Sequence, residues 1–457
     1  MAFIREIKKG DAIYLAKVES YREDGKVKQR VLEYIGKKEN GVAVIKTDIN
    51  QVNVTHVKRY ADIKVLVQLG YELKLNYLLG KHHQSIIALV IAHLLCKKSV
   101  LKISDWVAHT LLYEELDIES MTINKLYEAF DHLNELSFDR VEASLAAYWN
   151  EIAPQDYSSF VLDVTDTYYS GSKTESKARR GKDGKVSKLI QIGLIVSYDN
   201  GFPILHRTYE GNISNVKTFS DLLESMAALG LESIVMDRGF YSEENVTDLE
   251  QLKMMVIVGM KQTTGIQNKF LNKIDRDKIY TAINRIELKD TVVYGQEFPF
   301  LKGKLIVLYN PKMEVLKRDK LLAENIKTEE VKYVGYSLIY HNTKKDIATV
   351  VRKYFDKDIV ERSFRSLKGD VHLHPIRMWA TNRVEAHVKI CYLSLCILSL
   401  IQFKCRKLKL SAISVLDELK YIYKVDMMHA KTKKKWAKVV TLSNLQKEIL
   451  KALKCSV

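Results

Sequence analysis

Apolar and polar residues alternate along residues 12–35, on each side of Asp24-Gly25. A period of two residues is typical of a β-strand, and a central Asp-Gly is typical of a tight turn, so this stretch predicts a β-hairpin. One face of the hairpin would carry five cations: Lys17, Arg22, Lys26, Lys28 and Arg30. Such a face either contacts a phosphate backbone or is an ordinary solvated surface, and the pattern favours neither interpretation.

The pattern changes to a helical period between residues 57 and 149. Apolar residues recur three and four positions apart in residues 86–95, 105–116 and 125–136. Thr122 and Ser137 stand where N-caps are expected. Several short capped helices predict either a helix-turn-helix reader of DNA or a helical support domain. Histidines in this region lack the spacing of a zinc site, so we interpret them as core or surface residues: His82, His83, His93 and His109.

Strands and helices alternate after Pro154. Strands are predicted near residues 158–171, 188–199, 202–211, 232–239 and 254–260, with helices over 215–230 and 242–251. The order β-β-β-α-β-α-β predicts an α/β mixed fold with a five-stranded mixed sheet flanked by helices. The strand-like segments that follow interrupt this rhythm, and they predict a β-rich insertion before a helix over residues 354–368. Residues 384–405 are apolar enough for a buried helix.

These patterns divide the chain into six regions. We expect an N-terminal β-hairpin domain that can contact DNA, a helical domain that binds DNA, the first part of a catalytic core, the insertion, the second part of the core, and a basic helical tail: residues 1–56, 57–153, 154–261, 262–343, 344–404 and 405–457.

The charge of the chain indicates an anionic partner. Its 457 residues carry a formal net charge of +16. Residues 401–457 hold fourteen Lys or Arg against four Asp or Glu, and residues 171–190 hold seven against two. Nucleic acid is the simplest partner for such clusters, and a membrane surface could also use them.

The cysteines and the apolar runs indicate a cytoplasmic protein. The five cysteines are odd in number and form no Cys-x-x-Cys pair, so we expect reduced thiols. No apolar signal segment stands at the N-terminus. The runs 86–96 and 390–401 are shorter than the eighteen or more residues of a spanning helix, so both are interpreted as buried helices.

Four polar residues share one face of the helix predicted over residues 354–368. Their offsets of 0, 3, 7 and 14 residues repeat at about 100° per residue: Tyr354, Lys357, Glu361 and Lys368. A carboxylate among three donors is either a solvated charged face or part of a site.

Two further acids make the second interpretation stronger. Asp163 shares one face of the first predicted strand with Thr165, and Asp237 stands at the carboxyl end of the fourth. Together with Glu361 they suit two Mg²⁺ or Mn²⁺ ions, which activate a water or hydroxyl and stabilise a leaving phosphodiester oxygen. Capping or salt-bridge roles are the alternative for Asp163 and Asp237. Asp166 is the rival of Asp163, although it lies on the opposite strand face.

The order of elements and the sequence motifs resemble the RNase H-like DDE transposases. Tyr354-x2-Lys357-x3-Glu361-x6-Lys368 is similar to the Tyr-x2-Arg-x3-Glu-x6-Lys signature of insertion-sequence transposases that carry a β-rich insertion before the last Glu. Residues 163–171, 176–194, 209–219 and 234–245 look like further blocks of that family. The similarity runs from the N-terminal hairpin to about Phe403. In two places the chain departs from the pattern, because Lys357 stands for Arg and His374-Pro375 for Arg-Pro.

The resemblance implies a mechanism and a set of site residues. Asp163, Asp237 and Glu361 would hold two metal ions for cleavage of transposon ends and for attack of the freed 3′-hydroxyl on target DNA. The resemblance also implies a homodimer on paired double-stranded DNA ends and a nucleoid-associated location in the cytoplasm. Phosphates would be bound by Tyr354, Lys357, Arg365, Lys368 and Arg238, with the loop 177–188 as a weaker candidate.

Two other functions stay open at this stage. One is a catalytically idle DNA-binding protein or repressor derived from a transposase. The other is an RNase H-like nuclease that hydrolyses DNA without strand transfer. The intact set of acids argues against the first.

Overall fold

The computed structural model describes residues 2–39, 42–44, 49–154, 159–168, 178–180, 186–210, 215–323, 333–373, 376 and 381–457. The chain divides into two compact units. The first comprises residues 1–59 and 422–441, and the second comprises residues 60–421 and 442–457. His374-Pro375 and half of the basic loop at 177–188, namely residues 177 and 181–185, lie outside the described residues.

The first unit contains two antiparallel sheets. Strands β2 and β3 confirm the predicted hairpin, and both Asp24 and Gly25 adopt positive φ, as a two-residue type I′ turn requires. Two of the five hairpin cations form exposed ion pairs, Lys28 with Glu23 and Arg30 with Glu19. The strands of the larger sheet are β1 (Ala2–Lys9), β2 (Ala12–Glu23), β3 (Lys26–Glu39) and β4 (Val42–Val44), paired in that order.

The second sheet of this unit joins distant parts of the chain. Its order is β17-β16-β5, from β5 (Val52–Arg59), β16 (Tyr423–His429) and β17 (Lys435–Val439). The prediction of a helical tail over residues 405–457 is therefore wrong for residues 423–439. These residues form strands because β16 pairs antiparallel with β5, a long-range contact that overrides local helix preference.

The helical part of the second unit agrees with the predicted period. Thr122 caps its helix, since its side chain accepts a hydrogen bond from the Lys125 backbone N–H at 3.3 Å. Ser137 stands at the predicted N-cap position without a side-chain cap bond. The helices are α1 (Ala61–Glu72), α2 (Leu75–Leu78), α3 (His83–Leu95), α4 (Val100–Ala108), α5 (Leu112–Glu115), α6 (Ile123–Glu135) and α7 (Phe138–Ile152).

The second unit also contains a large mixed sheet. The five predicted strands pair in the order β9-β8-β6-β10-β11, but the sheet has ten strands rather than five. It is larger because β15 of the insertion (Tyr336–His341) pairs with β11, so that the four insertion strands β15-β14-β13-β12 continue the same sheet, and because the short strand β7 pairs with β8. The core strands are β6 (Phe160–Tyr168), β7 (Ala178–Arg180), β8 (Val186–Ser197), β9 (Pro203–Glu210), β10 (Ser233–Met236) and β11 (Met255–Met260).

The described residues of the insertion contribute four of these strands and three α-helices. They are α10 (Thr264–Lys269), α11 (Arg276–Ile279), β12 (Arg285–Glu287), β13 (Val292–Phe300), β14 (Gly303–Tyr309), α12 (Pro311–Ala323) and β15 (Tyr336–His341). The remaining helices of the unit are α8 (Asn215–Ala228), α9 (Glu243–Gln251), α13 (Ile347–Phe355), α14 (Asp358–Gly369), α15 (Thr381–Lys404), α16 (Ala412–Leu419) and α17 (Asn444–Ala452).

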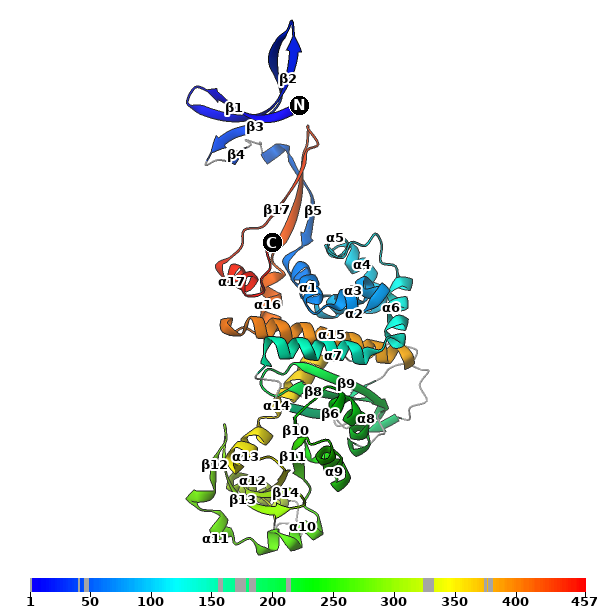
Figure 1. Ribbon diagram of the computed structural model, residues 1–457, viewed down its shortest axis with the longest axis vertical. Coiled ribbons are helices and arrows are strands. Elements are labelled where there is room, and N and C mark those ends of the chain that lie inside the picture. The colour runs from blue at the N-terminus through cyan, green and yellow to red at the C-terminus, as the bar shows by residue number, and fades with distance from the viewer. Residues whose placement is uncertain are drawn as a thin grey trace. The chain divides into compact units, whose positions relative to one another are not determined.

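Helix α15 forms the centre of the second unit. It contacts α3 and α6 on one side and β9 on the other, so that it lies between the helices and the sheet (Figure 1). Residues Arg383–Lys404 are long and apolar enough to cross a membrane, but 89% of their most apolar window is buried within the fold. The prediction of a buried helix is confirmed, although the argument from length is wrong because the helix continues beyond the apolar run.

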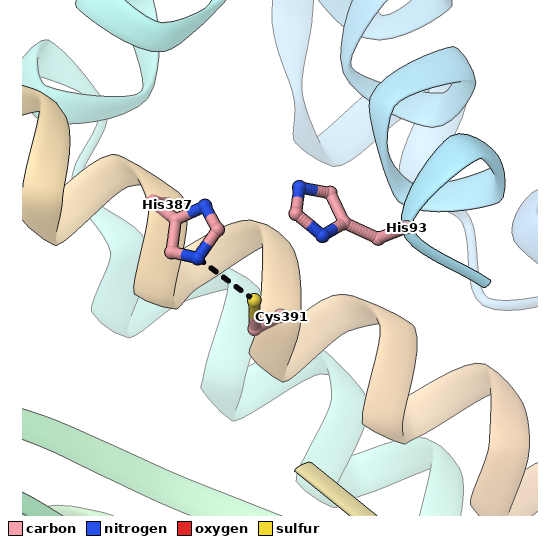
Figure 2. Close-up of side chains that lie close together, drawn as sticks. All are labelled: His93, His387 and Cys391. Atoms are coloured by element: carbon pink, nitrogen blue, oxygen red, sulfur yellow. Dashed lines mark hydrogen bonds between the residues drawn. The ribbon is translucent and has the colours of Figure 1, made fainter. Parts of the chain in front are cut away.

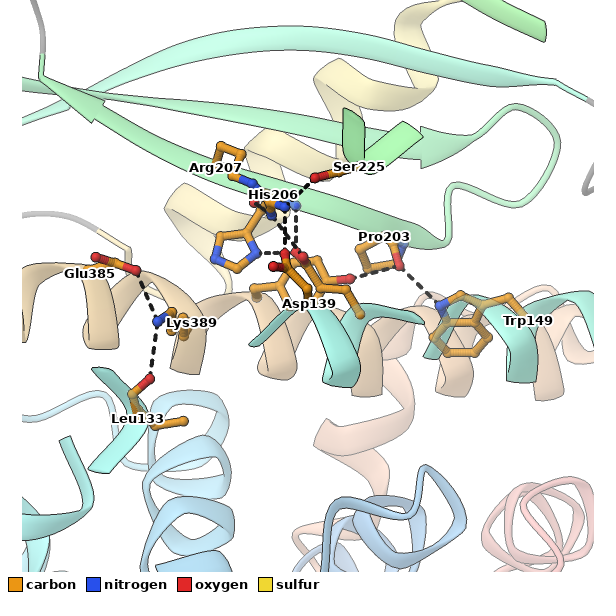
Figure 3. Close-up of polar contacts among 11 residues, drawn as sticks. Leu133, Asp139, Trp149, Pro203, His206, Arg207, Ser225, Glu385 and Lys389 are labelled. Carbon is orange, nitrogen blue, oxygen red and sulfur yellow. Dashed lines mark hydrogen bonds and ion pairs between the residues drawn. The ribbon is translucent and has the colours of Figure 1, made fainter. Parts of the chain in front are cut away.

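Buried polar contacts join the helices to the sheet (Figure 3). Glu142 on α7 is 1% exposed, and its carboxylate accepts hydrogen bonds from the backbone N–H and ring Nδ1 of His206 on β9, at 2.8 and 2.7 Å. Arg207 adds an ion pair at 2.8 Å. The Trp149 indole N–H donates to the Pro203 carbonyl at 3.0 Å. These bonds hold α7 against β9, the outermost of the five core strands.

Candidate active site

The two strand acids lie on neighbouring parallel strands. Strands β6 and β10 pair in parallel, and Leu162 lies opposite Met236. Asp163 follows Leu162 in the chain, and Asp237 follows Met236. Neighbouring strands are about 4.8 Å apart, so this register places the two acids side by side at the same edge of the sheet. Asp163 is half-buried, and its Oδ1 accepts a hydrogen bond from the Val164 backbone N–H at 2.7 Å.

The helix predicted over residues 354–368 is two helices. Helix α13 ends at Phe355, where the Asp356 N–H bonds the Arg352 carbonyl at 2.9 Å, and α14 begins at Asp358. The prediction of one continuous polar face is therefore wrong, because the turn at 356–357 breaks the helical period. Glu361 now lies in the first turn of α14, where the helix dipole favours a carboxylate.

The turn brings two of the predicted phosphate-binding residues to Asp237. The Lys357 ammonium lies 2.6 Å from Asp237 Oδ1, and the Tyr354 hydroxyl donates to the same oxygen at 3.3 Å. Lys357 also lies over the Tyr354 ring, 4.3 Å from its centroid. Burial raises the pKa of the Asp237 carboxyl, but the hydrogen bond and charge of Lys357 outweigh it, so the net pKa is below its usual range.

Gly259 on β11 makes this arrangement possible. A Cβ atom at this position would overlap the Tyr354 hydroxyl and lie 3.2 Å from Cβ of Arg238. The absence of a side chain therefore lets Tyr354 reach Asp237. Sequence reasoning missed Gly259, because nothing in its local pattern shows which ring approaches it.

Glu361 and Asp163 line one open cavity of about 510 Å³. Lys368 and Arg365 line it too, and the Lys368 ammonium donates to the Thr165 hydroxyl at 2.6 Å. Because Asp163 and Thr165 are on the same strand face, this contact places that face toward α14. Asp166 is half-buried on the opposite face and does not line the cavity.

Asp237 lines a different cavity, of about 660 Å³. The cations around it follow β10 and β11, lie on α12 or stand in the turn before α14, and sequence analysis missed two of them. They are Arg238, Lys261, Lys317 and Lys357. Lys261 stands just before the insertion and Lys317 on its helix α12, and only the fold brings them to Asp237.

The carboxylate oxygens of the three predicted acids do not all lie within 4.8 Å of one another. Across the described residues, the one group of three potential ligands whose atoms all lie within 4.8 Å is His93, His387 and Cys391. The structure thus brings Asp163 together with Asp237 by strand register and with Glu361 in one cavity, while Asp237 is held by Lys357.

Comparisons with known proteins place the chain among transposases. The family model described as Transposase DDE domain matches residues 154–397, and that of the IS1634 family transposase N-terminal domain matches residues 4–54. None of the curated proteins compared with the chain matched it.

Three solved structures are similar to the chain. A piggyBac transposase synaptic complex with hairpin DNA shares 11% identity with a TM-score of 0.42, over 79% of this chain and 76% of that one. A pre-cleavage Mos1 transpososome shares 11% identity with a TM-score of 0.17, over 35% and 54%. A Mos1 transposase paired-end complex with the left transposon end shares 10% identity with a TM-score of 0.16, over 44% and 58%.

Proposed function

The chain belongs to the DDE transposases of prokaryotic insertion sequences, and from that premise we propose that Asp163, Asp237 and Glu361 form the centre that cuts and joins DNA. We further propose that β9-β8-β6-β10-β11 with α14 is an RNase H-like core. The observation that carries the proposal is the parallel register of β6 and β10, which sets Asp163 beside Asp237.

The donor set fits hard divalent cations. All three side chains offer carboxylate oxygens, and Asp163 and Glu361 line a cavity open to solvent. Asp237 already attracts a cation, because the Lys357 ammonium contacts it. Two Mg²⁺ or Mn²⁺ ions held by Asp163, Asp237 and Glu361 would supply activation of the attacking oxygen and stabilisation of the leaving oxygen.

The proposed reaction has two steps, end cleavage and strand transfer. In the first, water attacks a phosphodiester at the transposon end, and the bond to the 3′ oxygen breaks to give a free 3′-hydroxyl and a 5′-phosphate. In the second, that hydroxyl loses its proton and its oxygen bonds to a phosphorus of target DNA, while the bond from this phosphorus to the target 3′ oxygen breaks and that oxygen takes up a proton.

The chain's cations position the DNA. Lys368 and Arg365 share the cavity of Asp163 and Glu361, so they are placed to bind the phosphates next to the scissile bond. Arg238, Tyr354 and Lys357 line the cavity of Asp237 and would bind the phosphates on its side. Phosphate contacts of this kind set the position of DNA without reading its sequence. The partner is double-stranded DNA, and the assembly is a homodimer on paired ends in the nucleoid.

The test is metal-dependent cleavage of transposon ends by purified full-length protein. We expect Asp163→Asn, Asp237→Asn and Glu361→Gln each to lose end cleavage by at least about 10³-fold with end binding retained. Asp166→Asn is the matched control and keeps cleavage. Wild-type cleavage rates in any one of the three variants would remove that residue from the centre.

Pre-cut ends separate the remaining alternatives. Joined products from pre-cut ends exclude a nuclease without strand transfer. Binding to ends without nicking in Mn²⁺ would instead show a catalytically idle DNA-binding protein.

A further inference from the structure

Three side chains that can ligate a metal lie together outside the two cavities that the acids line. His93 extends from α3, and His387 and Cys391 extend from α15 one turn apart (Figure 2). One ligand atom of each lies within 4.8 Å of the others. We propose that His93, His387 and Cys391 bind a thiophilic divalent cation of the Zn²⁺ class, a site independent of the proposed catalytic centre.

The separations are near those of a tetrahedral site. Bond lengths of about 2.0–2.1 Å to nitrogen and about 2.3 Å to sulfur imply ligand atoms roughly 3.3–3.6 Å apart. Cys391 Sγ lies 3.6 Å from His387 Nε2, the ring nitrogen that faces the Leu373 carbonyl, so the thiol and the ring are already close. The longer separations, up to 4.8 Å, close by rotation of the side chains. Three protein ligands leave the fourth position for water or another donor.

Backbone carbonyls orient both imidazoles. His93 Nδ1 lies 3.4 Å from the Val371 carbonyl, and His387 Nε2 lies 3.2 Å from the Leu373 carbonyl. Within the described part of the chain, the buried Nδ1 of His387 has no hydrogen-bond partner. A ring that donates one N–H to a carbonyl and leaves the other nitrogen unused has the arrangement of a metal-binding histidine.

Burial disfavours the charged form of all three side chains. It lowers the pKa of His93 and of His387. Burial raises the pKa of the Cys391 thiol well above its usual range. Binding therefore breaks the S–H bond, forms a metal–sulfur bond and releases the proton to solvent. His93 is half-buried, whereas His387 and Cys391 are buried.

The site would join two helices beside the end of α14. Val371 and Leu373, whose carbonyls face the two rings, follow the helix that carries Glu361. His372 between them has a φ of 56°, an uncommon backbone conformation for a residue other than glycine. A cation that fixes both rings would therefore fix this segment as well. Without a cation, the same residues are ordinary buried histidines that bond to carbonyls.

Cobalt titration of the full-length protein distinguishes a metal site from a pair of ordinary buried histidines. The protein is freed of metal with a chelator and titrated with Co²⁺ in excess Mg²⁺, which occupies carboxylate sites. We expect one Co²⁺ per chain with the near-ultraviolet charge-transfer band of a cobalt–thiolate bond. Cys391→Ser should lose this band, and Cys396→Ser should keep it, because Cys396 is equally buried on α15 but outside the group.

His93→Gln provides a second test at a more exposed position. It should weaken Co²⁺ binding at least about tenfold while the circular dichroism spectrum stays that of the wild type. The absence of a thiolate band in the wild-type protein would overturn the proposal. Its persistence in Cys391→Ser would overturn it too, whether or not DNA cleavage requires the acids.

Discussion

The ammonium group of Lys357 lies 2.6 Å from Oδ1 of Asp237, so this acid is paired with an internal cation before any metal is bound. Lys357 is also the position at which the chain departs from the Arg of its relatives' signature. Its contact in the structure is with the Asp237 carboxylate. In the proposed centre, a divalent metal ion and Lys357 would therefore compete for the same oxygen.

This competition predicts that Lys357→Met binds metal more tightly. Removing the internal cation should increase the affinity for Mn²⁺ by about tenfold in the absence of DNA, the factor equivalent to about 1.4 kcal/mol. Titration of Mn²⁺ followed by electron paramagnetic resonance measures the change. Lys289→Met is the control, because it breaks a Lys–Asp pair with Asp356, which lines neither cavity. Unchanged or weaker Mn²⁺ binding in Lys357→Met would contradict the competition.

Thr165 and Thr167 form a matched pair on one strand face. The Thr165 hydroxyl accepts a hydrogen bond from Lys368, whereas the buried Thr167 hydroxyl has no partner within the described part of the chain. Thr165→Val should slow end cleavage by roughly tenfold, since a bond to a charged donor contributes about 1.5–3 kcal/mol. Thr167→Val should leave cleavage unchanged and keep or raise the urea midpoint. Equal cleavage rates in the two variants would exclude a positioning role for Thr165.

A methyl group at position 259 should clash with the Tyr354 side chain, and a second substitution at Tyr354 should relieve the clash. Gly259→Ala should lower the free energy of unfolding by about 1–3 kcal/mol, because its methyl group meets the Tyr354 hydroxyl. Tyr354→Phe removes that hydroxyl, so the double variant should recover part of the loss in a double-mutant cycle. Gly265→Ala, where no atom lies within 4 Å, serves as the control. Additive effects of the two changes would argue against the contact.

The buried carboxylate of Glu142 should make the free energy of unfolding depend on pH. Burial raises the pKa of its carboxyl, but His206 and Arg207 more than offset this, so the folded-state pKa is below the ordinary 4.5. Its contribution is then fully present above pH 4.5 and is lost as the pH falls through the folded-state pKa. Glu142→Gln should cost about 3 kcal/mol at pH 7 and less in acid, measured by urea unfolding. Glu151→Gln, on an exposed acid of the same helix, should show no such trend.

Local patterns predicted the parts of the fold that local chemistry determines. Asp24-Gly25, the Thr122 cap and the five core strands follow from turn chemistry, side-chain oxygens and apolar periodicity. Strand β16 at 423–429 could not be predicted in this way, because its partner β5 lies hundreds of residues upstream.

The candidate site was predictable to a similar degree. Asp163, Asp237 and Glu361 could be selected by residue type and position on their elements. The partners of Lys357 and Lys368 could not, because the turn at 356–357 redirects one toward Asp237 and leaves the other by Thr165. A helical wheel assumes an unbroken helix, and here the helix is broken.

The pairing of β5 with β16 also sets a time order during protein synthesis. Residues 60–422 lie between the two strands, which is 363 residues. At about 5–20 residues per second, the ribosome needs roughly 20 to 70 s to make this stretch after β5 has emerged. The β17-β16-β5 sheet therefore forms only when nearly the whole chain exists. A chain whose translation stops before residue 423 carries the three acids but lacks this sheet.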